Sequence, residues 1–443
     1  MRPKGTKPSK QSAALFPPDL FRAGITMASA LLPYSLPSQD GIAVAGFLGL
    51  TEGNCEFMSN EKPTEKPMKI CFIIHNVTVR AGSERAQANL VNALSARGES
   101  ISIWSMYGAG RSPGFSLASG VKVNCGLKTP LPHFLDYSWL ACAFAIHVIR
   151  QRPAWIVCTG ANRLIIALLA ALVPGVKVVI WEHFPVTNSV TKPRGRLTRK
   201  IASVVASRIV TLTKSDKDLY ETLYSVSERV THIPNIVQSP GMTGRVRRKE
   251  ILAMGRLSHE KGFDLLLEAW SLAMPLLPDW SLRIVGDGQM RDELVRRAAS
   301  LKIEDRVTLA PFSDDPFSLY SECGMFVLSS RYEGLPFVLI EAMTCGAPCI
   351  SFDCPNGPRE VIRNGVNGVL VSAEQVIALA SAIVKLGVNP MLRKRIGDAA
   401  RSVSKPFSES RVVARWQEVL YGQMPIVGRP VATAKPTARS RAA

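Results

Sequence analysis

Short apolar runs alternate with helical or loop sequence along most of the chain. The first run, residues 69–75, precedes a glycine turn at Gly82 and a helical spacing of Leu90 and Leu94. A buried strand, a turn and a helix in this order form the repeating unit of a parallel α/β sheet. Similar strand-like runs follow at 101–104, 155–158, 176–181 and 208–211. This order predicts an α/β domain over residues 68–240.

The same pattern begins again after a polar break. Residues 238–249 contain Pro240, Gly241, Gly244 and four basic residues, a composition typical of an interdomain linker. New strand-like runs lie at 251–254, 281–285, 307–310, 325–328 and 348–351. We therefore predict two doubly wound, Rossmann-like domains, 68–240 and 241–423, the second with a closing C-terminal helix. Ligands of such sheets bind at the carboxyl ends of the strands, here in the cleft between the domains.

Both ends of the chain lack this periodicity. Residues 1–67 are rich in Pro, Ser, Gly and Lys, and residues 424–443 form a basic tail, so both segments are predicted to be disordered. Pro33, Pro37 and Asp40 interrupt the early apolar patches, which disfavours a signal peptide. No apolar run reaches the roughly 18 residues that span a bilayer. These patterns predict a cytoplasmic protein.

Nine cysteines are spaced irregularly along the chain. Cys345, Cys349 and Cys354 have neither a repeated C-x-x-C step nor a nearby histidine to complete a zinc site. We therefore expect reduced, mostly buried thiols.

The formal net charge of +19 is unevenly distributed. Residues 68–240 hold 20 Lys and Arg against 8 Asp and Glu, whereas residues 241–423 hold 23 against 21. A basic first domain suits nucleic acid, anionic lipid or a phosphorylated acceptor. The basic half has no aromatic platform and no pattern of a helix that enters a groove, which disfavours nucleic acid.

Two glutamates flank a predicted helix start in the second domain. Glu333 belongs to a loop with Gly334, Leu335 and Pro336, and Glu341 follows eight residues later on the helix. Pro336 suits the first helical turn, and the free N–H groups there form an anion site suited to a nucleotide diphosphate. Glu333 is then placed to hold sugar hydroxyls, and Glu341 to hold ribose hydroxyls.

Plainer interpretations of these glutamates remain open. Glu333 would cap the helix, and Glu341 would face water. A glycosidase pair is disfavoured, because retaining hydrolases hold their carboxyl groups about 5 Å apart, whereas eight helical residues rise about 12 Å.

A second loop carries two cations. Arg256 and Lys261 lie between the run 251–254 and the next helix. Arg256 can clamp phosphate oxygens as a planar fork, and Lys261 can bind them as a point charge. A basic loop on a basic protein is also commonplace.

A third signal, weak alone, is the tight turn at 285–288. Gly286 there would let the backbone approach a ligand. The turn is not the G-x-G-x-x-G of dinucleotide enzymes, and no P-loop pattern is present, which disfavours an oxidoreductase and an ATPase.

Together these motifs resemble the GT-B retaining glycosyltransferases of family 4. Gly255-Arg256-Leu257, Lys261-Gly262 and the E-(x)7-E of Glu333 and Glu341 have the order and spacing of that family. The resemblance covers about residues 68–423. The segment 352–360 is most similar to members that build bacterial exopolysaccharide and lipopolysaccharide, of the amylovoran galactosyltransferase type.

The resemblance implies a role for each site residue. Arg256 and Lys261 would neutralise the donor diphosphate, Glu333 would contact the sugar, and Glu341 the ribose. His183 matches the family histidine beside the reacting centre, although a plain loop or core histidine has the same signature. Gly82 is retained from the family's first-domain loop, where Ala81 replaces a more mobile glycine.

The resemblance further implies transfer with retention, through a front-face, oxocarbenium-like displacement, without metal or cofactor. Asp216 and Asp218 formally make a D-x-D, the manganese signature of another glycosyltransferase fold. They follow Thr213 at a predicted helix start, where acidic residues favour the helix dipole. We expect a nucleotide-sugar donor, UDP-hexose foremost, and a saccharide or polyprenyl-diphosphate-linked acceptor. A non-catalytic protein that binds nucleotide sugar or anionic polymer is the alternative.

The basic residues of the first domain also suggest a membrane surface. Five gather on one segment, namely Lys192, Arg194, Arg196, Arg199 and Lys200. A helix beginning near Arg196 would carry one apolar stripe beside them, made of Leu197, Ile201, Val204 and Val205. This pattern is typical of an interfacial helix, and equally of an amphipathic helix packed on the sheet. We predict docking on the anionic inner face of the cytoplasmic membrane.

Overall fold

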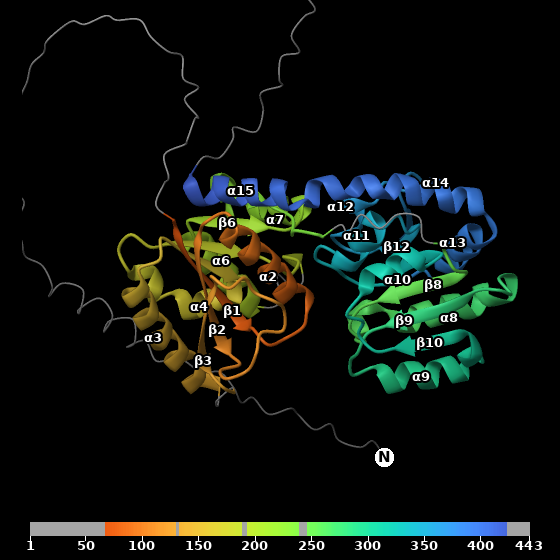
Figure 1. Ribbon diagram of the computed structural model, residues 1–443, viewed down its shortest axis with the longest axis horizontal. Coiled ribbons are helices and arrows are strands. Elements are labelled where there is room, and N and C mark those ends of the chain that lie inside the picture. Colours follow the sequence, from red (N-terminus) through yellow and green to blue (C-terminus); the bar gives the residue numbers. More distant parts are fainter. Residues whose placement is uncertain (1–66, 130–132, 188–192, 239–245, 423–443) are drawn as a thin grey trace, which may run out of the picture. The chain divides into compact units, whose positions relative to one another are not determined.

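The computed structural model describes residues 67–129, 133–187, 193–238 and 246–422. The expectations for residues 1–66, 239–245 and 424–443 and for Lys192 concern segments outside this description. Two wholly parallel sheets with helices on their faces lie within one compact unit of the chain (Figure 1). The predicted doubly wound architecture is confirmed.

The first sheet has the strand order β3-β2-β1-β4-β5-β6-β7. Its strands are β1 (Lys69–Asn76), β2 (Ser100–Tyr107), β3 (Lys122–Leu127), β4 (Trp155–Thr159), β5 (Lys177–Trp181), β6 (Arg208–Thr211) and β7 (Val230–His232). The helices between them are α2 (Gly82–Ser95), α3 (His133–Gln151), α4 (Leu164–Ala167), α6 (Pro193–Val205) and α7 (Lys214–Tyr224). The order reverses between β1 and β4, which opens a crevice at the carboxyl ends of these strands.

The second sheet repeats this topology with the order β10-β9-β8-β11-β12-β13. Its strands are β8 (Glu250–Met254), β9 (Ser281–Val285), β10 (Val307–Ala310), β11 (Met325–Leu328), β12 (Cys349–Asp353) and β13 (Val369–Ser372). Its helices are α8 (Phe263–Ala273), α9 (Arg291–Ser300), α10 (Pro316–Glu322), α11 (Phe337–Thr344), α12 (Pro358–Val361), α13 (Val376–Val388) and α14 (Pro390–Ala400). The order reverses between β8 and β11.

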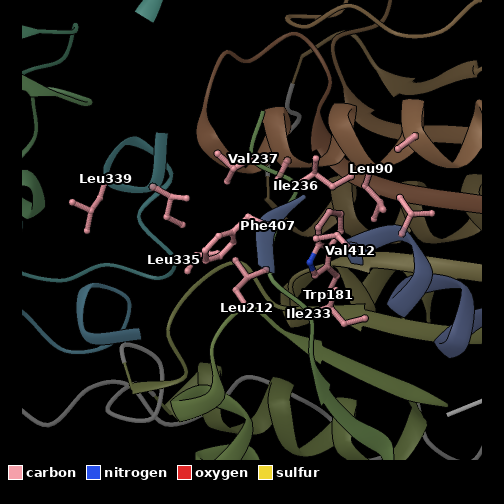
Figure 2. Packing of buried hydrophobic residues seen from close by; sticks show 14 of the residues in the cluster. Leu90, Trp181, Leu212, Ile233, Ile236, Val237, Leu335, Leu339, Phe407 and Val412 are labelled. Carbon is pink, nitrogen blue, oxygen red and sulfur yellow. The ribbon is translucent and has the colours of Figure 1, made fainter. Parts of the chain in front are cut away.

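The last helix, α15 (Glu409–Tyr421), follows the second sheet in sequence but packs on the first. Its Trp416 contacts Trp181 of β5 edge to face, with ring centroids 5.1 Å apart. The indole N–H of Trp155 in β4 donates to the carbonyl of Leu420 at 2.8 Å. Figure 2 shows Phe407 and Val412 among Trp181, Leu90, Ile233 and Ile236. The predicted closing helix therefore completes the core of the first domain.

Eight of the cysteines fall in the described residues, and all eight are free thiols. Six are buried, as expected, while Cys142 is exposed. No single helix in the described ranges is long and apolar enough to cross a membrane. The bent pair Val376–Val388 and Pro390–Tyr421 meets that criterion only jointly, across a bend of 102°.

Candidate functional site

Two loops meet where the strand order of the second sheet reverses. One follows β8 and carries Arg256 and Lys261, and the other follows β11 and carries Glu333. Arg331 joins them, because its guanidinium binds Asp264 at the start of α8 through both carboxylate oxygens, at 2.9 and 2.6 Å. Ser329 Oγ adds a hydrogen bond to the carbonyl of Lys261 at 3.0 Å. The two loops thus form one rigid wall.

Lys261 and Glu333 form an ion pair on this wall. Lys261 Nζ lies 2.7 Å from Glu333 Oε1, and the Ser330 hydroxyl donates to the same oxygen at 2.6 Å. Glu333 is largely buried. In contrast, Arg256 is exposed and forms no ion pair within the described residues, although its charge acts on the neighbouring Glu260. One cation of the wall is therefore free to meet an anion, and the second is shared with a carboxylate.

The loop of Glu333 packs against the segment 352–358. Gly357 has a φ of 71°, a left-handed conformation that favours glycine. A Cβ at this position would overlap the carbonyl oxygen of Gly334 and press on Pro336. Only glycine lets the two loops approach this closely.

Helix α11 begins at Phe337, with Pro336 as its N-cap in an extended conformation. We expected Pro336 within the first helical turn, and the structure places it one residue before that turn. The hydrogen bonds of Glu333 within the described residues come from Lys261 and Ser330 and not from the free N–H groups of the helix. Glu341 lies on α11 with 1% of its surface exposed, so the interpretation that it faces water is wrong. Both plainer interpretations of this glutamate pair are thereby set aside.

The first sheet contributes His183, two residues beyond β5. Its ring packs on Trp181, with centroids 4.3 Å apart, and its buried Nε2 has no hydrogen-bond partner in the described ranges. Burial, and then the charge of Arg163, lowers the pKa of His183 to about 3. A Cβ on Gly334 would lie 3.0 Å from the His183 carbonyl oxygen, so this histidine adjoins the Glu333 loop. It is neutral at physiological pH.

Asp216 fixes the segment that follows His183. Its Oδ1 accepts hydrogen bonds from the Val186 N–H at 2.9 Å and from Asn356 Nδ2 at 3.2 Å. Its own N–H donates to Thr213 Oγ1, the N-cap of α7, at 3.1 Å. Asp216 is buried and engaged in capping, whereas Asp218 is exposed. The helix-start interpretation of the D-x-D accounts for both residues.

These elements enclose a cavity of about 460 Å³, a volume in the range of small-ligand sites. Eight of the predicted site residues line it, namely Gly82, His183, Arg256, Lys261, Glu333, Gly334, Leu335 and Pro336. The free N–H groups at the start of α11 add a positive dipole end to this lining. The cavity therefore offers two cations, a helix N-terminus, the carboxylates of Glu260 and Glu333, and a neutral imidazole.

Two predicted residues do not line the cavity. Glu341 lies one helical turn beyond Phe337, which does line it. Gly286 is outside the lining as well, with a φ of 149°. A Cβ at Gly286 would overlap the carbonyl oxygen of Gly255, so its lack of a side chain serves the contact between two loops.

The glycine-to-alanine difference at position 81 carries no strain. Ala81 is the N-cap of α2, with an extended φ of −132° that any residue adopts. Both Ala81 and Gly82 line the cavity. The loop of the first domain thus reaches the site with alanine in place.

Sequence reasoning missed two residues of the site. Asn235 lines the cavity, is 1% exposed, and has no partner for either side-chain atom among the described residues. Arg331 joins the two loops through Asp264. Asn235 follows a three-residue strand that the apolar pattern does not reveal, and the partner of Arg331 is 67 positions away. The only local signal was the place of Arg331 two residues before Glu333.

Comparison with known proteins gives two family matches. Residues 80–239 match the family described as Glycosyltransferase Family 4, and residues 243–403 match the family described as Glycosyl transferases group 1. An uncharacterized glycosyltransferase of Haemophilus influenzae is 30% identical over 356 residues, which cover 80% of this chain and 99% of the relative.

Two further relatives have described roles. The amylovoran biosynthesis glycosyltransferase AmsD of Erwinia amylovora is 24% identical, over 80% of this chain and 99% of its own. An α-1,4-N-acetyl-D-galactosaminyltransferase of Campylobacter jejuni, whose acceptor is linked to PP-undecaprenol, is 28% identical over 80% and 98%. Among solved structures, Anabaena HepE in complex with UDP-glucose has a TM-score of 0.69 at 18% identity, over 80% of this chain and all of that one.

Proposed function

Since the chain belongs to the glycosyltransferases of group 1 and family 4 and has the GT-B fold, we propose that it transfers a hexose from a nucleotide sugar, UDP-linked, to a saccharide or polyprenyl-diphosphate-linked acceptor in the synthesis of bacterial surface polysaccharide. One observation carries the proposal. A single cavity gathers Arg256, Lys261 and Glu333 from the second sheet with His183 from the first.

The donor diphosphate would bind Arg256, Lys261 and the N-terminus of α11. Because the charge on the departing diphosphate grows in the transition state, these groups would stabilise that state more than the ground state. Lys261 would then turn from Glu333 toward phosphate, or bridge the two anions. Since this arrangement supplies two positive side chains and a helix dipole, we infer transfer without a metal ion.

Glu333 would hold hydroxyls of the transferred sugar, and Glu341 those of the ribose. The neutral His183 is able to donate one hydrogen bond and accept another near the anomeric carbon. We infer retention of configuration by a front-face displacement, in which a phosphate oxygen of the donor takes the proton of the attacking hydroxyl. The residues of this chain orient the two substrates and stabilise charge.

The relatives support the substrate classes. HepE binds UDP-glucose, and the Campylobacter relative acts on an acceptor linked to PP-undecaprenol. AmsD serves amylovoran synthesis, which supports an exopolysaccharide or lipopolysaccharide product with galactose as a candidate sugar.

A lipid-linked acceptor would bring the enzyme to the inner face of the cytoplasmic membrane. On α6, Leu197 and Val204 are exposed, but Ile201 and Val205 pack against the core, so only half of the expected stripe faces outward. Arg199 is buried in an ion pair with Glu182, which removes one of the five expected surface cations. We propose that the docking surface extends onto α3 and the short helix Ala170–Leu172 that packs on it. Their exposed apolar residues are Trp139, Ile146, Ile149 and Leu172.

The experiment that tests the function is a donor panel of UDP-, GDP- and ADP-hexoses with polyprenyl-diphosphate-linked saccharides, after exhaustive chelation. We expect release of UDP and an axial or equatorial linkage that matches the donor anomer, read by NMR. Release of no nucleotide from any donor, with binding retained, would favour the non-catalytic alternative. An absolute need for manganese would contradict the metal-free mechanism.

A further inference from the structure

The first turn of α2 contacts α11, the helix that carries Glu341. Gly82 adjoins Phe337, since a Cβ on Gly82 would lie 3.9 Å from the ring. Three residues along α2, Arg85 reaches Glu341, with 2.8 Å between Nη1 and Oε1. Residues three and four apart share one face of a helix. One face of α2 therefore meets one face of α11 at two successive positions.

The carboxylate of Glu341 is held on both of its oxygens. Arg85 binds Oε1, and the Tyr320 hydroxyl of α10 donates to Oε2 at 3.2 Å. The Arg85 guanidinium also lies 5.9 Å from the centre of the Phe317 ring, one turn before Tyr320. Because each carboxylate oxygen has two lone-pair sites, each oxygen of Glu341 keeps the capacity to accept one further hydrogen bond.

The electrostatic setting explains why Glu341 needs a cation. Burial raises the pKa of Glu341, while Arg85, and then Tyr320, act in the opposite direction. A buried carboxylate without a charged partner is strongly disfavoured. Since Arg85 belongs to the first domain, the second domain alone does not provide that partner.

A second ion pair between the same domains, Arg80 with Asp314, differs from the Arg85–Glu341 pair in its exposure to solvent. Arg80 Nη1 lies 3.3 Å from Asp314 Oδ1, but both side chains are mostly exposed, at 60% and 90%. Exposed pairs contribute little to stability or geometry. The Arg85–Glu341 pair, with side chains 24% and 2% exposed, is of a different kind.

We propose that Arg85 is a positioning residue for the donor, which holds the Glu341 carboxylate in the orientation that receives the ribose hydroxyls. The proposal rests on the proposed function, in which Glu341 binds ribose. Glu341 itself does not line the cavity but lies one turn beyond Phe337, which does. The first domain thereby takes part in binding a nucleotide whose other contacts belong to the second. Donor affinity and association of the two domains are coupled through this one pair.

The test measures nucleotide affinity by titration calorimetry on the full chain. The probe is whichever of UDP, GDP and ADP binds the wild type most tightly, together with its 2′,3′-dideoxy analogue. The variants are Arg85→Ala, the conservative Arg85→Lys, Glu341→Gln, the double variant Arg85→Ala with Glu341→Gln, and the control Arg80→Ala.

We expect Arg85→Ala to weaken binding of the ribonucleotide roughly tenfold, the loss of about one charge-assisted hydrogen bond. Arg85→Lys should recover part of this loss, and Arg80→Ala should leave affinity unchanged. The dideoxy analogue has no hydroxyls for Glu341, so Arg85→Ala should hardly alter its affinity. In the Glu341→Gln background, Arg85→Ala should add little.

The outcomes separate two kinds of failure. If Glu341→Gln leaves ribonucleotide affinity unchanged, the ribose assignment in the proposed function fails. If Glu341→Gln weakens binding but Arg85→Ala does not, or tightens it, the positioning role is overturned. An equal loss for the ribonucleotide and the dideoxy analogue in Arg85→Ala would show a merely structural effect. Arg85→Lys supplies the same comparison if Arg85→Ala does not fold.

Discussion

Asn235 is a buried site residue whose unpaired side-chain amide lowers the stability of the fold. It is 1% exposed, lines the cavity, and has no hydrogen-bond partner for Oδ1 or Nδ2 within the described ranges. A buried amide left unpaired costs about 1–3 kcal/mol. A group that destabilises the empty protein and faces a ligand cavity is best explained by contact with the ligand.

Replacing Asn235 with Leu should therefore separate stability from binding. We expect the free energy of unfolding without ligand to stay level or rise by about 1 kcal/mol, because the unpaired amide is lost. Binding of a nucleotide sugar or acceptor should weaken at the same time. Thermal melting and calorimetry check the two effects. A less stable variant with unchanged binding would show that Asn235 has a structural role.

The cations of the wall make a second prediction at this scale. Neutralising Arg256 or Lys261 to Ala should lower kcat roughly a hundredfold, the usual effect of removing one group that stabilises transition-state charge. Lys249→Ala is the matched control, since Lys249 is exposed and pairs with Asp279 in the same domain. Steady-state kinetics decide the matter, and an unchanged kcat in both variants would remove these residues from the site.

His183 makes the stability of the protein depend on pH. In the unfolded chain it titrates near 6.5, whereas burial lowers its pKa in the folded chain to about 3. Between these values the unfolded state binds a proton that the folded state does not, so stability is lost as the pH falls from 6.5 toward 3. Chemical denaturation over this window should show a shallower pH slope for His183→Gln. An unchanged slope in His183→Gln would show that this histidine does not cause the pH dependence.

At the scale of elements, the apolar pattern of the sequence predicted central strands more reliably than edge strands. The apolar runs located β1, β2, β4, β5, β6, β8, β9, β11 and β12, which are mostly buried, and also β10, an edge strand that is not buried. It missed β3, β7 and β13, which are all edge strands. An edge strand needs little apolar surface, and β7 has only three residues. Pattern alone does not distinguish such a strand from a loop.

Helix α6 shows that spacing in the sequence likewise does not reveal which side chains of a helix turn inward. Its spacing of apolar and basic residues fits an interfacial helix, yet Arg199 turns inward and binds Glu182 at 3.0 Å. The Tyr220 hydroxyl donates to the same carboxylate at 2.8 Å. Sequence spacing placed Arg199 beside other cations, but its partner Glu182 lies 17 residues away, directly after β5. Similarly, the motifs located the loops of the site, while the contacts of Glu341 and Arg331 required the fold.

The buried ion pair between Arg199 and Glu182 predicts a large loss of stability when Arg199 is replaced. Arg199→Ala should lower the free energy of unfolding by about 3–5 kcal/mol, because the Glu182 carboxylate would stay buried without its cation. Urea denaturation measures the effect. Arg196→Ala, an exposed change on the same helix, should have almost none. Equal small effects in both variants would contradict the structural role of Arg199.

At the scale of the whole molecule, the basic first domain predicts reversible binding to anionic membranes. Each basic residue near such a surface contributes about 1 kcal/mol, and exposed apolar side chains on α3 add to this. Flotation should show binding to anionic vesicles, weakened by salt and by a variant with Gln at Arg194, Arg196 and Lys200. A second variant, Ile149→Ser with Leu172→Ser, should also reduce recovery. Equal recovery on neutral vesicles would show that charge does not drive the association.

The return of α15 to the first sheet has a consequence for synthesis of the chain. Strands β1 to β7 leave the ribosome well before residue 409, yet the Trp181 ring contacts Trp416 and the Trp155 indole donates to the carbonyl of Leu420 only after α15 has been made. During translation the apolar face of the first domain that α15 covers therefore stays exposed until the last helix has been made. The strands of the second domain are all made before that point. A nascent chain released before its last helix would expose that face to chaperones and proteases. Loss of α15 would therefore leave the first domain without part of its core although all of its strands are present.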